Sequence, residues 1–149
     1  MLYHEKQYKG YCRCHAINNL LGKKALTVQM FDTLCDEYDT SNNFTDKCSR
    51  NRCVFYNNGG TNNIFGFILH KLGYRIQMKH YDFYTNVNIA MPTNNTVGYI
   101  IYNMRHTYCL HIDKNRNMYI IDSMQQKPRQ INNLQCFRRK NLGVIEVIK

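Results

Sequence analysis

Cys12 has the chemical type and the local setting of a catalytic nucleophile. It stands where an amphipathic segment begins, and the unpaired N–H groups and the dipole of a helix N-terminus stabilise a thiolate. The side-chain amide of Gln7 can donate to the oxyanion that forms when Cys12 attacks a carbonyl carbon, with the backbone N–H of Cys12 as the second donor. A thiolate also needs a base and a group that orients this base. We expect His106 and Asp122 to fill these two roles.

A predicted hairpin brings His106 and Asp122 together. Two β-rich runs, residues 106–112 and 118–122, flank the polar turn at residues 113–117. Antiparallel pairing around this turn places residues whose numbers sum to about 228–230 opposite each other, so the two side chains lie within about one residue pair of each other. His111 is the rival base, but it points to the opposite face of the strand and lies about 16 Å nearer the turn. The spacing therefore favours His106.

Each of these residues also has an ordinary structural explanation. A cysteine at a helix start is more often a small buried hydrophobic residue, and a lone histidine on a strand is usually a surface or core residue. Cys14 faces away from Cys12, which indicates a structural thiol. His15 shares the face of Cys12 but is badly oriented as a base, so we expect it either to pack or to support the residues of the site. The order of Gln, Cys, His and Asp, with spacing that suits one cleft, favours catalysis over these separate explanations.

The elements that must position these residues follow from hydrophobic periodicity. We predict helices over residues 12–21, 27–38 and 62–72, with Thr27 as N-cap of the second and Asn62 or Asn63 as N-cap of the third. Short β-rich runs follow at residues 74–79, 97–103, 106–112, 118–122 and 144–148. Residues 39–60 form a polar, loop-like segment. This order predicts an α+β fold in which N-terminal helices pack on a mostly antiparallel sheet.

Length and composition set further limits. The 149 residues show no repeat and no linker, so we expect a single domain over residues 1–149 and a monomer. No apolar run approaches the ~18–20 residues that span a bilayer, and the N-terminus has no apolar signal region. Seven cysteines, an odd number, indicate free thiols in a reducing compartment, which is the cytoplasm or the nucleus. The formal charge of +10 suggests an anionic partner.

The opening of the chain resembles that of Josephin domains, the ataxin-type cysteine deubiquitinases. Their pattern is H-E-K-Q, a short gap, C-x-x-H and then two asparagines, and residues 3–22 read YHEKQYKGYCRCHAINNLLG. The residues in register are His4, Glu5, Lys6, Gln7, Cys12, His15, Asn18 and Asn19. The runs RHTYCLHI and MYIIDSM are similar to the family's H-W-x-x-V and N-L-(D/N)-S strands. The run NNGGTNNIFGFILHKLGY, which precedes both, is similar to the family's block of G-N-x-D, a helix and then glycine with a hydrophobic residue.

The resemblance implies a papain-like fold that hydrolyses the bond after the C-terminal glycine of ubiquitin, with ubiquitin and its conjugates as partners. It makes Cys12 the nucleophile, His106 the general base, Asp122 the orienting acid and Gln7 the oxyanion donor, and it implies no cofactor and no metal. Thr107 stands where the family has Trp. Residues 39–60 are shorter than the family's helical arm, so we expect an open cleft and weak discrimination among ubiquitin linkages.

Four other functions are compatible with parts of the sequence. One alternative is an inactive Josephin-like ubiquitin-binding module, although a pure binder has no need of an intact Cys–His–Asp set, and another is a protease for another ubiquitin-like modifier. A nucleic-acid-binding module would use basic residues near the C-terminus, but no nucleic-acid-binding motif accompanies them; these residues are Lys127, Arg129, Arg138, Arg139 and Lys140. A zinc site would have as ligands Cys48 and Cys53 with Cys35 or His80. A second pair of closely spaced cysteine or histidine ligands, which is typical of structural zinc sites, is missing from this pattern.

Overall fold

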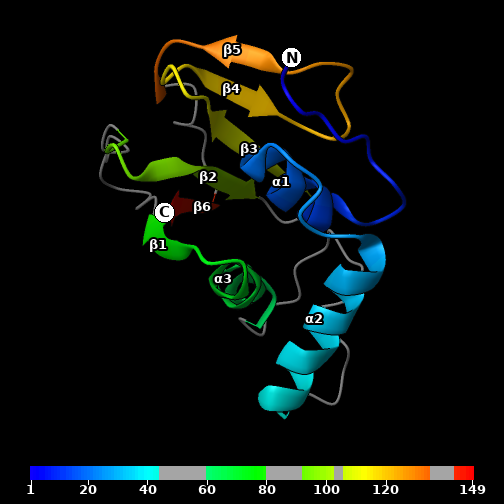
Figure 1. The fold of residues 1–149 in the computed structure, drawn as a ribbon. Coiled ribbons are helices and arrows are strands. Elements are labelled where there is room, and N and C mark those ends of the chain that lie inside the picture. Colours follow the sequence, from blue (N-terminus) through cyan, green and yellow to red (C-terminus); the bar gives the residue numbers. More distant parts are fainter. Residues whose placement is uncertain (44–59, 80–91, 103–105, 135–142) are drawn as a thin grey trace.

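The structure is a computed structural model that describes residues 1–43, 60–79, 92–102, 106–134 and 143–149. In these residues, three helices precede six strands (Figure 1): α1 (Cys12–Leu21), α2 (Val28–Ser41), α3 (Gly60–Lys71), β1 (Arg75–Lys79), β2 (Thr96–Tyr102), β3 (Thr107–Ile112), β4 (Met118–Ile121), β5 (Arg129–Ile131) and β6 (Gly143–Ile148). The predicted α+β class is confirmed. None of the helices in the described part of the chain has the length and apolar character of a membrane span.

The six strands form one sheet in the order β1-β6-β2-β3-β4-β5, and all neighbouring pairs are antiparallel. The β3–β4 hairpin has the predicted register, because Cys109 pairs with Ile121 and Leu110 pairs with Ile120. Strand β5 is a correction to the predicted set of strands. Two of its three residues are exposed and only Ile131 is buried, so the segment lacks the alternation that marks a longer strand.

The first helix has the predicted bounds, and the second is longer than predicted. Gly22 ends α1 in the left-handed conformation, with φ at 68°, which glycine adopts without a steric cost. Thr27 caps α2 as expected, since its side chain accepts a hydrogen bond from the Met30 N–H at 3.1 Å. The helix continues to Ser41, and the start of the predicted loop, including the buried Asp39, belongs to it.

The third helix begins earlier than predicted. Its first residue is Gly60, so Asn62 and Asn63 lie within the helix and neither is its N-cap. Residues 44–59 of the predicted loop lie outside the described residues. The expectation of an open cleft with weak linkage discrimination depends on that segment and stays a prediction.

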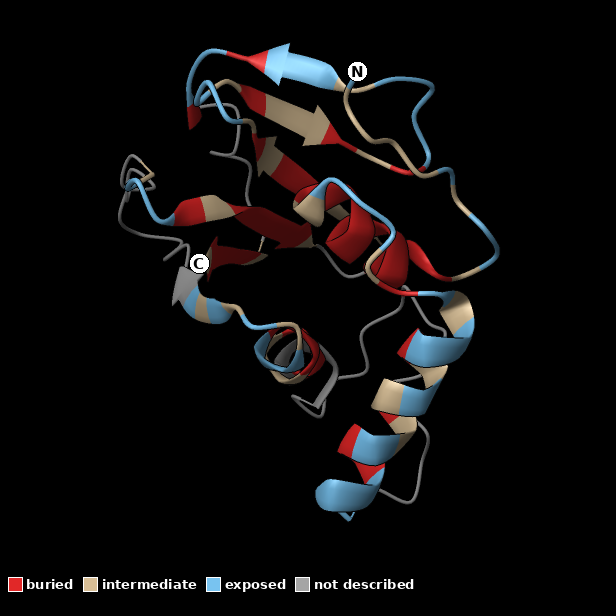
Figure 2. Cartoon of the chain, in the orientation of Figure 1, coloured by how far each residue is buried: buried red, intermediate tan, exposed pale blue. Residues whose placement is uncertain are grey.

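Two hydrophobic clusters cover the two faces of the sheet. The larger one lies between the helices and one face, and Figure 2 shows α1 as buried along almost its whole length. From the sheet it takes Ile100, Cys109, Ile121, Ile145 and Val147. The smaller cluster occupies the opposite face and comprises Tyr99, Ile101, Leu110, Ile112, Met118, Ile131, Leu134 and Val144. The sheet is therefore buried on both faces, with α1 fixed against β2 and β3.

Candidate active site

His106 and Asp122 form a direct hydrogen bond in the structure. The His106 Nε2 atom lies 2.7 Å from Asp122 Oδ1, and the two side chains are 18% and 14% exposed. One further pair in the β3–β4 register places Asp122 opposite Tyr108, so His106 reaches the carboxylate diagonally across the hairpin. An ionised carboxylate only accepts, so Nε2 carries the proton, and Nδ1 is the basic nitrogen of the neutral ring. The predicted pairing is confirmed.

The environment of Asp122 favours its charged form. Burial alone raises the pKa of this carboxyl group. The hydrogen bond from His106, that from the Met124 N–H at 2.9 Å, and the charges of His106 and His4 together lower it more. The net result is a pKa below the ordinary value of an aspartate. An ionised Asp122 can hold the imidazole in one tautomer and stabilise the imidazolium that forms when His106 takes a proton.

Gln7 lies next to this pair because the N-terminal segment runs along the turn that follows β4. The Gln7 N–H donates to the Ser123 carbonyl at 2.8 Å, and the Ser123 hydroxyl donates to Gln7 Oε1 at 2.5 Å. His4 Nε2 lies 3.0 Å from the Asp122 carbonyl oxygen. The Gln7 amide nitrogen donates to the Lys9 carbonyl at 2.6 Å. Hydrogen bonds therefore hold the Gln7 amide by both its oxygen and its nitrogen, with Ser123, the residue after Asp122, as the partner of the oxygen.

Glu5 holds the N-terminal segment against α1. Its Oε2 accepts from His15 Nδ1 at 3.0 Å and from the Asn18 amide at 2.8 Å, and its backbone N–H donates to Asn19 Oδ1 at 2.6 Å. The other ring nitrogen of His15 accepts from the Tyr8 N–H at 3.0 Å. Both nitrogens of His15 are therefore engaged in binding this segment. The predicted packing or supporting role of His15 is confirmed.

Cys12 is the first residue of α1, as predicted, and it is fully buried. No acidic side chain lies in the first turn of the helix, so nothing there offsets the positive end of its dipole. The expectation of a free thiol is wrong for Cys12, which forms a disulfide in this structure. Its partner lies outside the described residues. A disulfide sulfur cannot act as a thiolate nucleophile, so any reaction at Cys12 starts only after this bond is reduced.

The other described cysteines are free thiols, and their surroundings suppress their reactivity. Burial raises the pKa of the Cys14 thiol and that of the Cys35 thiol to about 12 each. Burial also raises the pKa of Cys109 well above its ordinary value. Thiols of this kind carry almost no thiolate near neutral pH. Among the described cysteines, Cys12 is distinguished by its place as the first residue of α1, where the helix dipole would favour a thiolate once the disulfide is reduced.

The first turn of α1 lies toward the end of the sheet that carries His106. At the other end of the helix, His111 Nδ1 lies 2.8 Å from the Leu20 carbonyl oxygen, close to the β3–β4 turn. The helix rises about 12 Å from Leu20 back to Cys12. The extended chain of β3 and the residue before it covers about 16 Å from His111 back to His106. The helix α1 packs along β3, and the chain before α1 is anchored at the end of β4. The first turn of α1 and His106 therefore lie toward the same end of the sheet.

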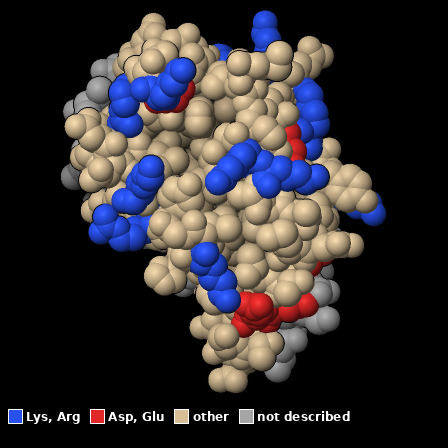
Figure 3. All heavy atoms as spheres, viewed as in Figure 1, with Lys and Arg blue, Asp and Glu red and all other residues tan. Residues whose placement is uncertain are grey.

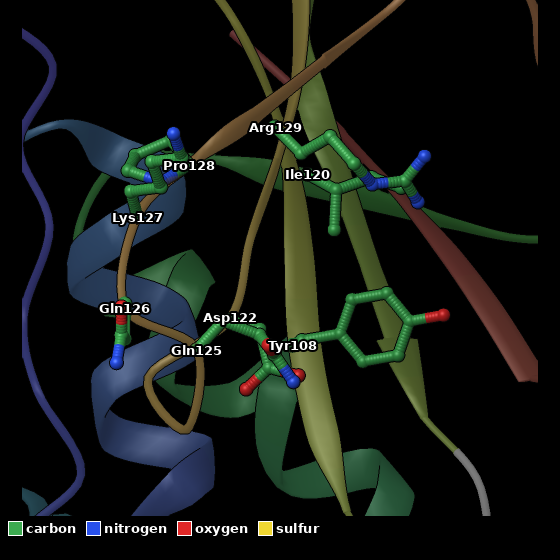
Figure 4. Close-up of a pocket in the computed structure, with 8 residues that line it drawn as sticks. All are labelled: Tyr108, Ile120, Asp122, Gln125, Gln126, Lys127, Pro128 and Arg129. Atoms are coloured by element: carbon green, nitrogen blue, oxygen red, sulfur yellow. The ribbon is translucent and has the colours of Figure 1, made fainter.

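A cavity of about 640 Å³ opens beside the His106–Asp122 pair. Asp122 and Gln125 lie near the base of the Tyr108 side chain, Lys127 comes from the segment that leads into β5, and Arg129 is the first residue of β5 (Figure 4). The Tyr108 ring also stacks on the imidazole of His106, with ring centroids 6.2 Å apart. The cavity therefore lies next to His106, because two residues that contact His106, Tyr108 and Asp122, line it.

Two residues of the site were not predicted from the sequence. Ser123 is buried and binds both the backbone and the side chain of Gln7. The signal in the sequence that could have indicated Ser123 is its position after Asp122 in the MYIIDSM run. Tyr108 contacts His106 and lines the cavity. Thr107 is fully buried, and its hydroxyl oxygen has no hydrogen-bond partner within the described residues.

The alternative zinc and nucleic-acid sites fall mostly outside the described residues. No group of three or more potential metal ligands occurs in the described ranges. The remaining proposed ligands and basic residues are not described; these are Cys48, Cys53, His80, Arg138, Arg139 and Lys140. Searches against models of protein families and against curated proteins found no match to the chain.

Proposed function

We propose that this chain is a cysteine-dependent deubiquitinase with a papain-like fold, which hydrolyses the bond after the C-terminal glycine of ubiquitin. The observation that carries the proposal is the 2.7 Å hydrogen bond between His106 and Asp122. This pair lies at the end of β3 and β4 toward which the first turn of α1 points. The Josephin-like run at residues 3–22 supports the choice of substrate. Its Glu5 and His15 bind each other, so these two positions act as one structural unit.

The proposed reaction uses only groups of this chain and water. His106 Nδ1 takes the proton of the reduced Cys12 thiol, and Sγ forms a bond to the glycine carbonyl carbon. The backbone N–H of Cys12 and the Gln7 amide stabilise the oxyanion. When the C–N bond breaks, the imidazolium gives its proton to the departing lysine amine, which leaves a thioester. Water then attacks the thioester and His106 takes its proton, after which the C–S bond breaks and the proton returns to Cys12.

The test is hydrolysis of ubiquitin 7-amido-4-methylcoumarin by the reduced protein. We expect turnover by the wild type and none by Cys12→Ala. Matched fluorogenic substrates built on other ubiquitin-like proteins separate a ubiquitin protease from a protease for a related modifier. Binding of ubiquitin without turnover of any of these substrates would contradict hydrolysis and would support a ubiquitin-binding module.

A further inference from the structure

The cavity beside His106 and Asp122 carries an uncompensated positive charge. Lys127 and Arg129 line it, and neither side chain forms an ion pair within the described residues. Asp122 is the acidic residue among the described lining, and its carboxylate is engaged by His106. Glutamine amides and the Tyr108 phenol add neutral hydrogen-bonding groups. A ligand with carboxylate groups fits this lining better than a cationic or purely apolar ligand.

The volume and the position of the cavity indicate which part of a substrate would enter it. A volume of about 640 Å³ is within the ~300–1,000 Å³ range of binding pockets. In the proposed reaction, His106 donates the proton to the departing amine, so the leaving group must approach the imidazole. The Tyr108 ring stacks on that imidazole and also lines the cavity. Residues flanking the modified lysine would therefore lie within reach of Lys127 and Arg129.

Charge also argues against the ubiquitin tail as the occupant. That tail contains arginines, and the cationic lining would repel them. We propose that this cavity binds acidic residues next to the ubiquitin-modified lysine, so that the enzyme selects conjugates by the sequence of the leaving group. This inference rests on the proposed function and adds a substrate class to it.

The surface around the cavity makes a local test necessary. Lys and Arg side chains are spread over the face in Figure 3, where the acidic side chains gather mainly over α2. A general positive field would favour acidic substrates wherever they bound. A charge reversal at the cavity must therefore be compared with an equal reversal elsewhere. Lys23 and Lys24, which are exposed and follow α1, provide that control.

The experiment measures kcat/KM of the reduced protein on ubiquitin joined to the lysine side chain of short peptides with acidic, neutral or basic flanks. We expect the acidic conjugate to be cleaved about threefold to tenfold faster than the basic one, with the preference falling as salt is added. The double variant Lys127→Glu, Arg129→Glu should reverse the order, whereas Lys23→Glu, Lys24→Glu should keep it. The rate of each variant on the conjugates is divided by its rate on the coumarin substrate, which has no peptide leaving group and therefore reports the chemical step alone.

The outcomes separate this inference from the proposed function. Turnover of the coumarin substrate without any preference among the three conjugates would overturn the inference and leave the proposed function standing. An equal change of preference in both double variants would also overturn it, because a general field would then explain the selection. Failure to cleave any substrate would contradict the proposed function itself.

Discussion

His111 Nδ1 lies 2.8 Å from the carbonyl oxygen of Leu20 and so binds the last turn of α1 to β3. His106, five residues earlier, instead binds Asp122. The histidine within β3 and the histidine immediately before it therefore have different roles, one structural and one proposed to be catalytic. This difference gives the first prediction.

Replacing each histidine by alanine should separate activity from stability. His106→Ala should lower kcat by several orders of magnitude, because the thiol loses its base. His111→Ala should retain most activity and lower the free energy of unfolding by about 1–2 kcal/mol through the lost hydrogen bond. Coumarin-substrate kinetics and urea unfolding of both variants check this. Equal losses of activity in the two variants would contradict the assignment of the base.

Activity should depend on reduction, because Cys12 is in a disulfide. We expect the oxidised protein to be inactive and dithiothreitol to restore turnover. Cys12→Ala should be inactive with or without the reductant. The matched comparison is reduced wild type with reduced Cys12→Ala, since neither has this disulfide and their unfolding curves should agree. Cys14→Ala should keep most of the activity. Full turnover by protein with an intact Cys12 disulfide would refute the role of this residue.

Gln7 and Ser123 should affect the same step by different amounts. Gln7→Ala should lower kcat by about 10²–10³ with little change in KM, because an oxyanion donor acts on charge that develops in the transition state. Ser123→Ala removes the hydroxyl that holds Gln7 Oε1, so it should lower kcat in the same direction but less. Ser123→Thr, which keeps a hydroxyl, is the control and should restore part of the activity. A rise in KM at constant kcat for Gln7→Ala would show that Gln7 contacts the ground-state substrate.

The lowered pKa of Asp122 predicts a pH dependence of stability. A carboxyl group whose pKa is lower in the folded state stabilises the fold above its unfolded pKa of about 3.9, and this contribution is lost as pH falls through the folded value. The wild type should therefore be more stable than Asp122→Asn at pH 5–7, and the difference should shrink below about pH 4. Urea unfolding across this range measures it. The variant should also lose activity, but less than His106→Ala. A stability difference that grows on acidification would contradict this role of Asp122.

Thr107 offers a test of packing next to the proposed base. Its hydroxyl is buried without a partner among the described residues, and such a group costs about 1–3 kcal/mol. Thr107→Val keeps the shape and removes the hydroxyl, so thermal unfolding should show a variant that is equally stable or more stable by about 1 kcal/mol. Thr96→Val is the contrast, because the Thr96 hydroxyl donates to Glu146 at 2.7 Å and its loss should destabilise. Marked destabilisation by Thr107→Val would show that its hydroxyl has a partner.

Hydrophobic periodicity, capping residues and turn length predicted the helix and the hairpin that hold the candidate site. The bounds of α1 follow from its apolar stripe and Gly22, and the pairing of His106 with Asp122 follows from the length of one turn. Strand β5 was missed because its pairing with β4 depends on the sheet edge rather than on its own composition.

Contacts between distant segments could not be predicted in this way. Ser123 meets Gln7 across 116 positions of sequence, and no local period encodes such a contact. The disulfide at Cys12 likewise depends on which cysteine the fold brings near, and a count of cysteines does not give that information. The sequence therefore predicted the candidate residues of the site better than the contacts and bonds that hold them in place.

The most direct test of the central claim is the reaction of the reduced protein with ubiquitin that carries a C-terminal propargylamide, followed by mass spectrometry of the intact adduct and of its peptides. We expect one ubiquitin to be added, with the modified residue mapped to Cys12. Neither Cys12→Ala nor the unreduced wild type should react, whereas Cys14→Ala should react like the wild type. Labelling at Cys14, Cys35 or Cys109, or no adduct with a fully reduced and folded protein, would contradict the account.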